Sequence, residues 1–143
     1  MTTFLFALLF SVSQLFGGIT LNQNQTKYKP LNATGVQSGT ATDPTVVSNH
    51  AVIYATIFSD VDTISGLIMQ LDVAPGTGQS VTQTLWVNGA ATSLTATISD
   101  NATSASDYTN SVAVSAGDIA AWKITTSSGF QFNNNLIYAA KQR

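Results

Sequence analysis

An Asn-Gly pair at residues 88 and 89 stands between two segments in which apolar and polar residues alternate, and no other feature of the chain constrains the fold as strongly. The alternation has a period of two, which is typical of β-strands with one buried face. Asn and Gly both tolerate the positive φ angles that a type I′ turn requires. The sequence therefore predicts a β-hairpin over residues 80 to 99. Its buried face is expected to carry Val81, Leu85, Val87, Leu94, Ala96 and Ile98, and its wet face Thr82, Thr84, Trp86, Ser93, Thr95 and Thr97.

Similar strand signals recur about every eight to twelve residues from residue 45 to the C-terminus. They cover residues 50 to 58, residues 64 to 73, two strands within 108 to 126 around a turn at 115 to 118, and residues 133 to 140, with a polar loop at 99 to 107. Together with the hairpin they make about seven or eight short antiparallel strands, which is typical of a β-sandwich or a small barrel. We predict an all-β, antiparallel β-sandwich or small barrel, of which the jelly roll is one arrangement. The periodicity itself leaves immunoglobulin-like and other Greek-key topologies open.

Charged residues are scarce, at 8% of the sequence, against about a quarter in an ordinary globular protein. All seven acidic residues are Asp, so the chain lacks the Glu and Lys pairs that stabilise exposed helices, which favours strands. No Lys or Arg occurs between residues 30 and 122, and the formal net charge is -2, so we expect no binding to nucleic acid. The absence of Cys excludes disulfides, thiolate metal sites and Cys nucleophiles.

The chain begins with an apolar segment, residues 1 to 19, which is followed by a polar stretch at residues 20 to 44. We expect the polar stretch to be an extended linker with one short strand at most, and the β-sandwich domain to span residues 45 to 143. Read as a helix, the first segment has apolar residues at steps of three and four over about two heptads. These candidate anchoring and assembly residues are Leu5, Leu8, Val12 and Leu15.

Three interpretations of the first segment stay open. It is a retained segment that packs at a threefold axis or docks onto a larger assembly, a secretory signal that is cleaved near Gly18, or a membrane-associated segment. A signal peptide normally has a positively charged start and a cleavage site between small residues, and this chain has neither in clear form. The apolar run is also much shorter than the roughly 20 residues that a membrane-spanning helix needs, so we expect no stable membrane span.

Residues that could carry catalysis are few and scattered. His50 is the single histidine and falls within an apolar segment, where a structural role is expected, and the chain has no Gly-x-Ser-x-Gly motif. The Asp residues fall at predicted turns and strand ends, where Asp commonly accepts hydrogen bonds from the local backbone. A Ca²⁺ site between Asp60, Asp62 and the loop at residues 100 to 107 stays an alternative to ordinary solvated turns. We therefore predict no catalytic residue, no metal site and no cofactor.

Trp86 is the best candidate for contact with a partner, because it lies on the predicted wet face of the hairpin. An indole in that position can stack on a sugar ring or cover a neighbouring subunit. The alternative for both Trp86 and Trp122, the second tryptophan, is burial in the core. Trp86 is thus a predicted glycan or subunit contact.

Residues 65 to 125 contain a series of turn and strand motifs in a recognisable order. A strand ends in Ala-Pro-Gly-Thr-Gly at residues 74 to 78, the hairpin turns at Asn88-Gly89, a Thr-rich strand covers residues 92 to 99, and a Val-Ala-Val run precedes Ala-Gly-Asp within residues 112 to 118. In this order the motifs resemble a jelly-roll-like β-sandwich module of tailed-phage structural proteins and related bacterial surface proteins. The resemblance covers less than half of the chain and leaves out the N-terminal segment.

The resemblance implies a non-enzymatic structural protein on the surface of a virion. Such a protein would be a capsid decoration or a subunit of a head fibre or tail fibre, similar in outline to the trimeric jelly rolls of complement and tumour-necrosis-factor type. The implied partners are two further copies in a homotrimer, capsid or other virion proteins bound through the N-terminal segment, and host-surface glycans met during viral attachment. The alternative is a secreted, extracellular bacterial adhesin or carbohydrate-binding β-sandwich module.

Overall fold

The computed structural model describes residues 13–29, 31, 37–38, 56–130 and 134–143, and within them every regular element is a β-strand. Strands follow from the sequence, because apolar residues alternate with Thr, Ser, Asn and Gln instead of recurring every three or four positions. The strands are β1 (Ser13–Leu21), β2 (Thr26–Lys29), β3 (Gln37–Ser38), β4 (Thr56–Ile57), β5 (Asp62–Leu71), β6 (Gly76–Val87), β7 (Ala90–Asp100), β8 (Ser104–Val114), β9 (Ile119–Thr126) and β10 (Asn134–Gln142).

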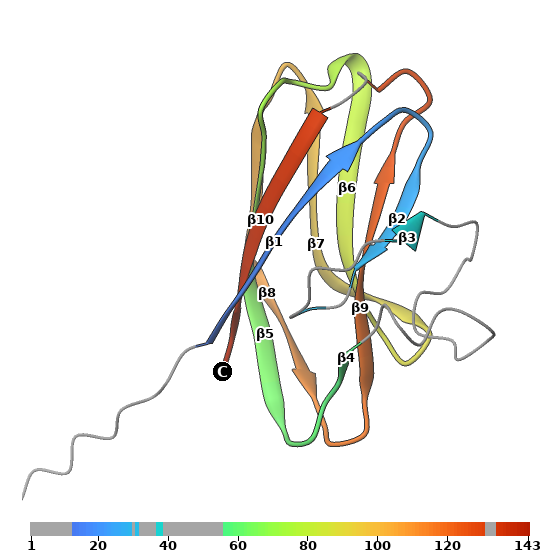
Figure 1. Ribbon diagram of the computed structural model, residues 1–143. Helices are drawn as coiled ribbons and strands as arrows, with labels where there is room; N and C mark the ends of the chain where they lie inside the picture. The colour runs from blue at the N-terminus through green and yellow to red at the C-terminus, as the bar shows by residue number, and fades with distance from the viewer. Residues whose placement is uncertain (1–12, 30, 32–36, 39–55, 131–133) are drawn as a thin grey trace, which may run out of the picture.

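The strands form two antiparallel sheets that pack face to face (Figure 1). Sheet A has the order β1-β10-β5-β8, and sheet B has the order β3-β2-β9-β6-β7, with β4 paired to one end of β9. When the two-residue strands β3 and β4 are set aside, each sheet has four strands, and the order is the double Greek key of a jelly roll. The predicted jelly-roll-like β-sandwich is therefore confirmed.

The first strand, β1, lies where the sequence predicted part of an apolar helix, and that part of the prediction is wrong. β1 pairs with the last strand, β10, over nine residue pairs. Two features favour a strand here, because Gly17 and Gly18 weaken a helix while Ile19 and Leu21 alternate into the core. Leu15 therefore belongs to a sheet and not to a heptad. The other anchoring candidates lie outside the described residues: Leu5, Leu8 and Val12.

The β-sandwich already includes Ser13, the first described residue, so the predicted division into a segment at 1 to 19, a linker at 20 to 44 and a domain from 45 is corrected as well. A short turn at residues 22 to 25 carries the chain from β1 in sheet A to β2 in sheet B. The strand predicted at residues 50 to 58 is described only from Thr56, where β4 pairs with β9 through two residues. His50 lies outside the described residues.

The central hairpin is confirmed. β6 and β7 pair in antiparallel register on either side of Asn88 and Gly89, whose φ angles of 49° and 85° fit the predicted turn. The residues predicted to point inward are buried, except Val87, which is half-buried, and the Thr residues of the other face stay partly or fully exposed. The polar loop predicted at residues 99 to 107 is shorter, because β7 continues to Asp100 and β8 begins at Ser104.

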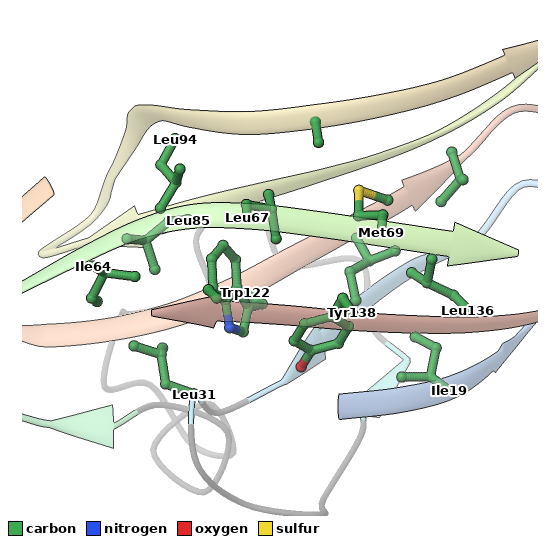
Figure 2. Close-up of a cluster of buried hydrophobic side chains, with 14 of the residues drawn as sticks. Ile19, Leu31, Ile64, Leu67, Met69, Leu85, Leu94, Trp122, Leu136 and Tyr138 are labelled. Carbon is green, nitrogen blue, oxygen red and sulfur yellow. The ribbon is translucent and has the colours of Figure 1, made fainter. Parts of the chain in front are cut away.

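The core lies between the two sheets and takes apolar side chains from both (Figure 2). Trp122 of sheet B is fully buried and lies edge-on to Tyr138 of sheet A, with ring centroids 5.9 Å apart. This aromatic pair joins the sheets directly, and burial raises the pKa of the Tyr138 phenol, which therefore stays un-ionised. Of the two tryptophans, Trp122 is a core residue and only Trp86 reaches the outer surface.

Two lysines of β2 close one open side of the sandwich, between β1 and β2. Lys27 Nζ donates to the Thr20 carbonyl at 2.7 Å, and Lys29 Nζ donates to the Gly18 carbonyl at 3.4 Å. Lys29 is only 3% exposed, and its ammonium lies 5.6 Å from the centroid of the Tyr138 ring. Burial lowers the pKa of Lys29, because the charged form loses hydration. The two bonds also occupy carbonyls of an edge strand that would otherwise be open to pairing.

A buried carboxylate closes the opposite side, between β7 and β8. Asp107 of β8 is 8% exposed and accepts the backbone N–H of Thr95 in β7 at 3.1 Å. It also accepts the backbone N–H groups of Thr109 and Asn110 and the Asn110 side-chain amide. Desolvation raises the pKa of this carboxyl, but the hydrogen bonds from Asn110, Thr95 and Thr109 outweigh that effect and hold the pKa below its ordinary value. Asp107 thus lies within a strand and joins the sheets, which corrects its prediction as a turn or strand-end residue.

Replacing Asp107 by Ala is expected to lower the free energy of unfolding by about 2 to 3 kcal/mol, because the part-buried backbone N–H groups of Thr95, Thr109 and Asn110 lose their charged acceptor. Asp107→Asn, the matched control, keeps one acceptor oxygen and should cost about half as much. Because the folded-state pKa is lowered, the contribution of Asp107 is complete above about pH 4 and is lost as the pH falls through the folded-state pKa. Urea denaturation at several pH values measures these effects. A loss below about 0.5 kcal/mol for the Ala variant would show that Asp107 does not join the sheets.

Candidate functional site

The outer face of sheet B carries an array of hydroxyl side chains, which we call the hydroxyl face. Side chains at paired positions of neighbouring strands lie on the same face of a sheet. One row across β2, β9, β6 and β7 consists of Thr26, Thr125, Thr82 and Thr97. The next row contains Lys123, Thr84 and Thr95, and ends on β2 at the buried Tyr28. We define the hydroxyl face as these four Thr residues together with Lys123, Thr84, Thr95 and Trp86.

Pairs of hydroxyl groups from neighbouring strands order this face. The Oγ1 atoms of Thr82 and Thr97 are 2.9 Å apart, and those of Thr84 and Thr95 are also 2.9 Å apart. The Thr95 hydroxyl donates in addition to the Gln83 carbonyl at 3.1 Å. Because a hydroxyl has a single proton, Thr84 is then the donor in its pair with Thr95, and both oxygens keep lone pairs. This pair is therefore able to accept hydrogen bonds from a ligand.

Trp86 lies at one edge of the hydroxyl face and is half-buried. The Nζ atom of Lys123 lies 4.6 Å from the centroid of the Trp86 ring, and Lys123 is paired in register with Thr84. A cation over an indole is attracted by the negative face of the ring, which holds the ammonium against Trp86. Lys123 is the one charged residue of the hydroxyl face as defined.

Two hydrogen-bonded turns hold the end of β6 next to Trp86. Asn88 Nδ2 donates to Asp118 Oδ1 at 2.6 Å, and Asn88 Oδ1 accepts the Ile119 N–H at 2.9 Å. Asp118 also accepts the Ser115 N–H at 2.7 Å. The bonds from Ser115 and then from Asn88 hold the pKa of Asp118 below its ordinary value. The Asn-Gly and Ala-Gly-Asp motifs of the sequence thus form one corner of the molecule.

The outer face of sheet A has a different character, and we call its exposed apolar residues the apolar face. Ile68 of β5 and Ile137 of β10 are 42% and 57% exposed, and Ile68 is paired with Ala139 of β10. Tyr108 of β8 is 67% exposed and flanks Gly66 of β5. The apolar face consists of Ile68, Tyr108, Ile137 and Ala139. Apolar surface of this kind on a folded domain marks a site of interaction when it is contiguous.

The acidic residues considered for Ca²⁺ do not come together. Asp62 pairs with Val114 at the start of β5, whereas the loop that follows Asp100 leads into Ser104, which pairs with Gln70 near the end of β5. The alternative Ca²⁺ site is therefore not formed. Within the described ranges, no three His, Cys, Asp or Glu residues lie close enough to hold a metal ion. Several carboxylates accept backbone N–H groups at turns or strand ends, as predicted: Asp60, Asp62, Asp72, Asp100 and Asp118.

The sequence placed Trp86 on an outer face, as the structure does, but sequence reasoning missed Lys123. The period of two in β9 puts Lys123 opposite the buried Trp122, so its outward position could have been predicted. The pairing of β9 with β6 could not, because it joins segments that are far apart in the chain. The apolar face was missed because apolar residues on both sides of a strand are also typical of a doubly covered strand.

Comparison with known proteins found no matching protein-family model, no matching curated protein and no matching solved structure. Among the residues that the structure describes, no helix is long and apolar enough to cross a membrane. The two outer faces of the sandwich are therefore the surfaces from which a function can be inferred.

Replacing Asn88 by Asp is expected to destabilise the protein, relative to wild type, more at pH 7 than at about pH 4. At pH 7 the new carboxylate would stand where an amide now donates to Asp118, and two like charges at this distance repel. The repulsion weakens as the pH falls and one of the two carboxyls takes up a proton. In the wild type, by contrast, the folded-state pKa of Asp118 is lowered, so Asp118 contributes fully to the free energy of unfolding above about pH 4. That contribution is lost as the pH falls through the folded-state pKa.

Urea midpoints of both proteins at the two pH values measure this difference. Asn101→Asp is the matched control, because Asn101 lies in the exposed turn between β7 and β8. Equal losses for the Asn88 and Asn101 variants at pH 7 would contradict the role of the corner.

Proposed function

We propose that this chain is a non-enzymatic structural subunit of a phage virion, either a capsid decoration or a subunit of a head fibre or tail fibre. The N-terminal segment contacts capsid or other virion proteins, and the jelly roll is displayed on the virion surface as one copy of a homotrimer. The observation that carries the proposal is the apolar face, because a jelly roll that worked alone would leave this face in water.

The apolar face supports assembly because its side chains belong to a sheet whose inner face already fills the core. Ile68, Ile137 and Tyr108 therefore contribute little to the fold of a single chain. Contact with identical copies would remove their apolar surface from water, which is the main favourable term in most protein association. Jelly rolls also occur in viral capsid proteins and lectins, which supports the proposal by analogy of fold.

The position of β1 supports retention of the N-terminal segment. Cleavage near Gly18 would remove more than half of the residue pairs between β1 and β10 and expose an edge of β10. The apolar residues up to Val12 connect directly to Ser13, the first residue of this edge strand. A contact made by these residues would therefore act on the sandwich itself, without the linker that the sequence predicted.

A secreted, extracellular bacterial adhesin or carbohydrate-binding module is the second candidate. The observation that favours it is Trp86, which is half-buried at the edge of the hydroxyl face, where an indole can meet a sugar. Both candidates use the same sandwich as a binding module. They differ in what the N-terminal segment does.

The intact chain is expected to be a trimer in solution, with a mass three times the 15.0 kDa of one chain. Replacing Ile68 and Ile137 together by Ser should yield monomers that keep a cooperative thermal transition, because neither residue fills the core. Light scattering after size exclusion measures the mass. Thr97→Ala on the hydroxyl face is the control and should stay trimeric. A monomeric wild-type chain would overturn the proposed homotrimer.

Removal of residues 1 to 12, which leaves β1 whole, is expected to abolish attachment to purified virions while the jelly roll stays folded. Co-sedimentation with the virions and a thermal melt measure the two properties. The mass of the subunit taken from its native source separates the two candidate functions. A native subunit that lacks residues 1 to 18 would favour the secreted protein.

A further inference from the structure

We propose that a small inorganic anion, such as chloride, binds inside the sandwich between three side chains that we call the core donor cluster: Lys29, Trp122 and Tyr138. They come from β2, β9 and β10 and lie toward the open side between β1 and β2. Their polar atoms are an ammonium, an indole N–H and a phenol hydroxyl, and each of these groups can donate a hydrogen bond. The inference does not depend on the proposed virion function, because the cluster lies within one jelly roll.

Contacts between the three side chains bring them together. Lys29 is paired in register with Trp122, so both side chains lie on the same face of sheet B, which is the inner face. The ring centroids of Trp122 and Tyr138 are 5.9 Å apart, and Lys29 Nζ lies 5.6 Å from the centroid of the Tyr138 ring. The exposed fractions of Lys29, Trp122 and Tyr138 are only 3%, 0% and 4%. A ligand that all three contact must therefore be small.

Two of the donors lack an acceptor within the part of the chain that the structure describes. Trp122 Nε1 and the Tyr138 hydroxyl are buried there and have no hydrogen-bond partner. Figure 2 shows that both atoms point to the side of the core that carries Ile19 of β1 and Leu31, which follows β2. Lys29 Nζ reaches a carbonyl of β1 on this same side. Because a buried donor without an acceptor is costly, one acceptor placed here would stabilise both aromatic side chains.

The charge of Lys29 favours an anion over a water molecule as that acceptor. Its hydrogen bond to the Gly18 carbonyl is long, at 3.4 Å, and among the described residues no carboxylate pairs with it. Lys27 adds a second positive charge two residues away, where its Nζ donates to the Thr20 carbonyl. Burial lowers the pKa of Lys29 because the ammonium loses hydration, and a bound anion would offset that loss. Hydrogen bonds to an ionised acceptor are also stronger than those to a neutral one.

The test is the midpoint of urea unfolding of the full chain as chloride replaces gluconate at constant ionic strength. We expect the midpoint to rise with chloride, because a ligand that binds only the folded state stabilises it. Tyr138→Phe removes only the hydroxyl and should raise the chloride concentration at which the rise begins about tenfold. Lys29→Met should abolish the rise. Tyr108→Phe and Lys141→Met are the matched controls and should keep the full rise, because both side chains are exposed.

Emission from Trp122 gives a second readout at the site itself. The chain has two tryptophans, so Trp86→Phe leaves Trp122 as the single emitter. Bromide, a quenching anion of similar size to chloride, should reduce this emission along a saturable curve, and added chloride should reverse the effect. Adding Tyr138→Phe to this variant should shift the curve to about tenfold more bromide. This readout needs no Lys29 variant, so it decides the question even if Lys29→Met does not fold.

Three results would overturn the anion site. The first is an equal midpoint in chloride and in gluconate, as expected if only water reaches the cluster. The second is a chloride effect of the same size in wild type and in Tyr138→Phe, which would place the binding elsewhere. The third is bromide quenching that rises linearly without saturation. None of these results bears on the oligomeric state or on attachment to virions, so the anion site and the proposed function fail separately.

Discussion

Closure of the two open sides of the sandwich is the constraint on which the rest of this structure depends. A jelly roll passes its chain between two sheets at both sides, and backbone groups there that the sheets leave unpaired need other hydrogen-bond partners. Lys27 and Lys29 bond to carbonyls of β1 on one side, and Asp107 bonds to an N–H of β7 on the other. In a chain with so few charges, three of them serve this purpose. Each of the two outer faces is therefore left with few charges of its own, and the two faces can differ sharply in chemistry.

The parts of the fold that depend on local sequence could be predicted, and the parts that depend on distant pairing could not. The hairpin at Asn88-Gly89 follows from turn chemistry and alternation within a short stretch. β1 and β2 do not, because Leu15 fits a helical spacing as well as a strand, and Lys27 and Lys29 look like solvent-exposed residues of a linker. Only their pairing with β10 and β9 decides between these readings, and that pairing brings together the two ends of the chain.

The same distinction between local sequence and distant pairing explains which parts of the candidate site could be predicted. The outward position of Trp86 follows from the alternation of inward and outward side chains along the hairpin. Its contact with Lys123, in contrast, requires β9 to lie beside β6. Asp107 shows the limit of prediction from the sequence in another way. A carboxylate in a Ser- and Thr-rich segment looks like a loop residue until its four hydrogen bonds are known. The apolar face required knowledge of which side of β5 and β10 meets sheet B. Composition and periodicity therefore indicated the kind of surface, and topology decided which residues share it.

The pairing of β1 with β10 has a mechanical consequence if the chain is held by its first residues. A pull on that attachment would act along β1 from its first residue, parallel to the strand, while the body of the jelly roll resisted through β10. The inter-strand hydrogen bonds stand perpendicular to such a force, so the nine residue pairs would be sheared together and not peeled apart one after another. Shear of this kind distributes a load over the whole strand. A chain held in this way is suited to stay attached under drag.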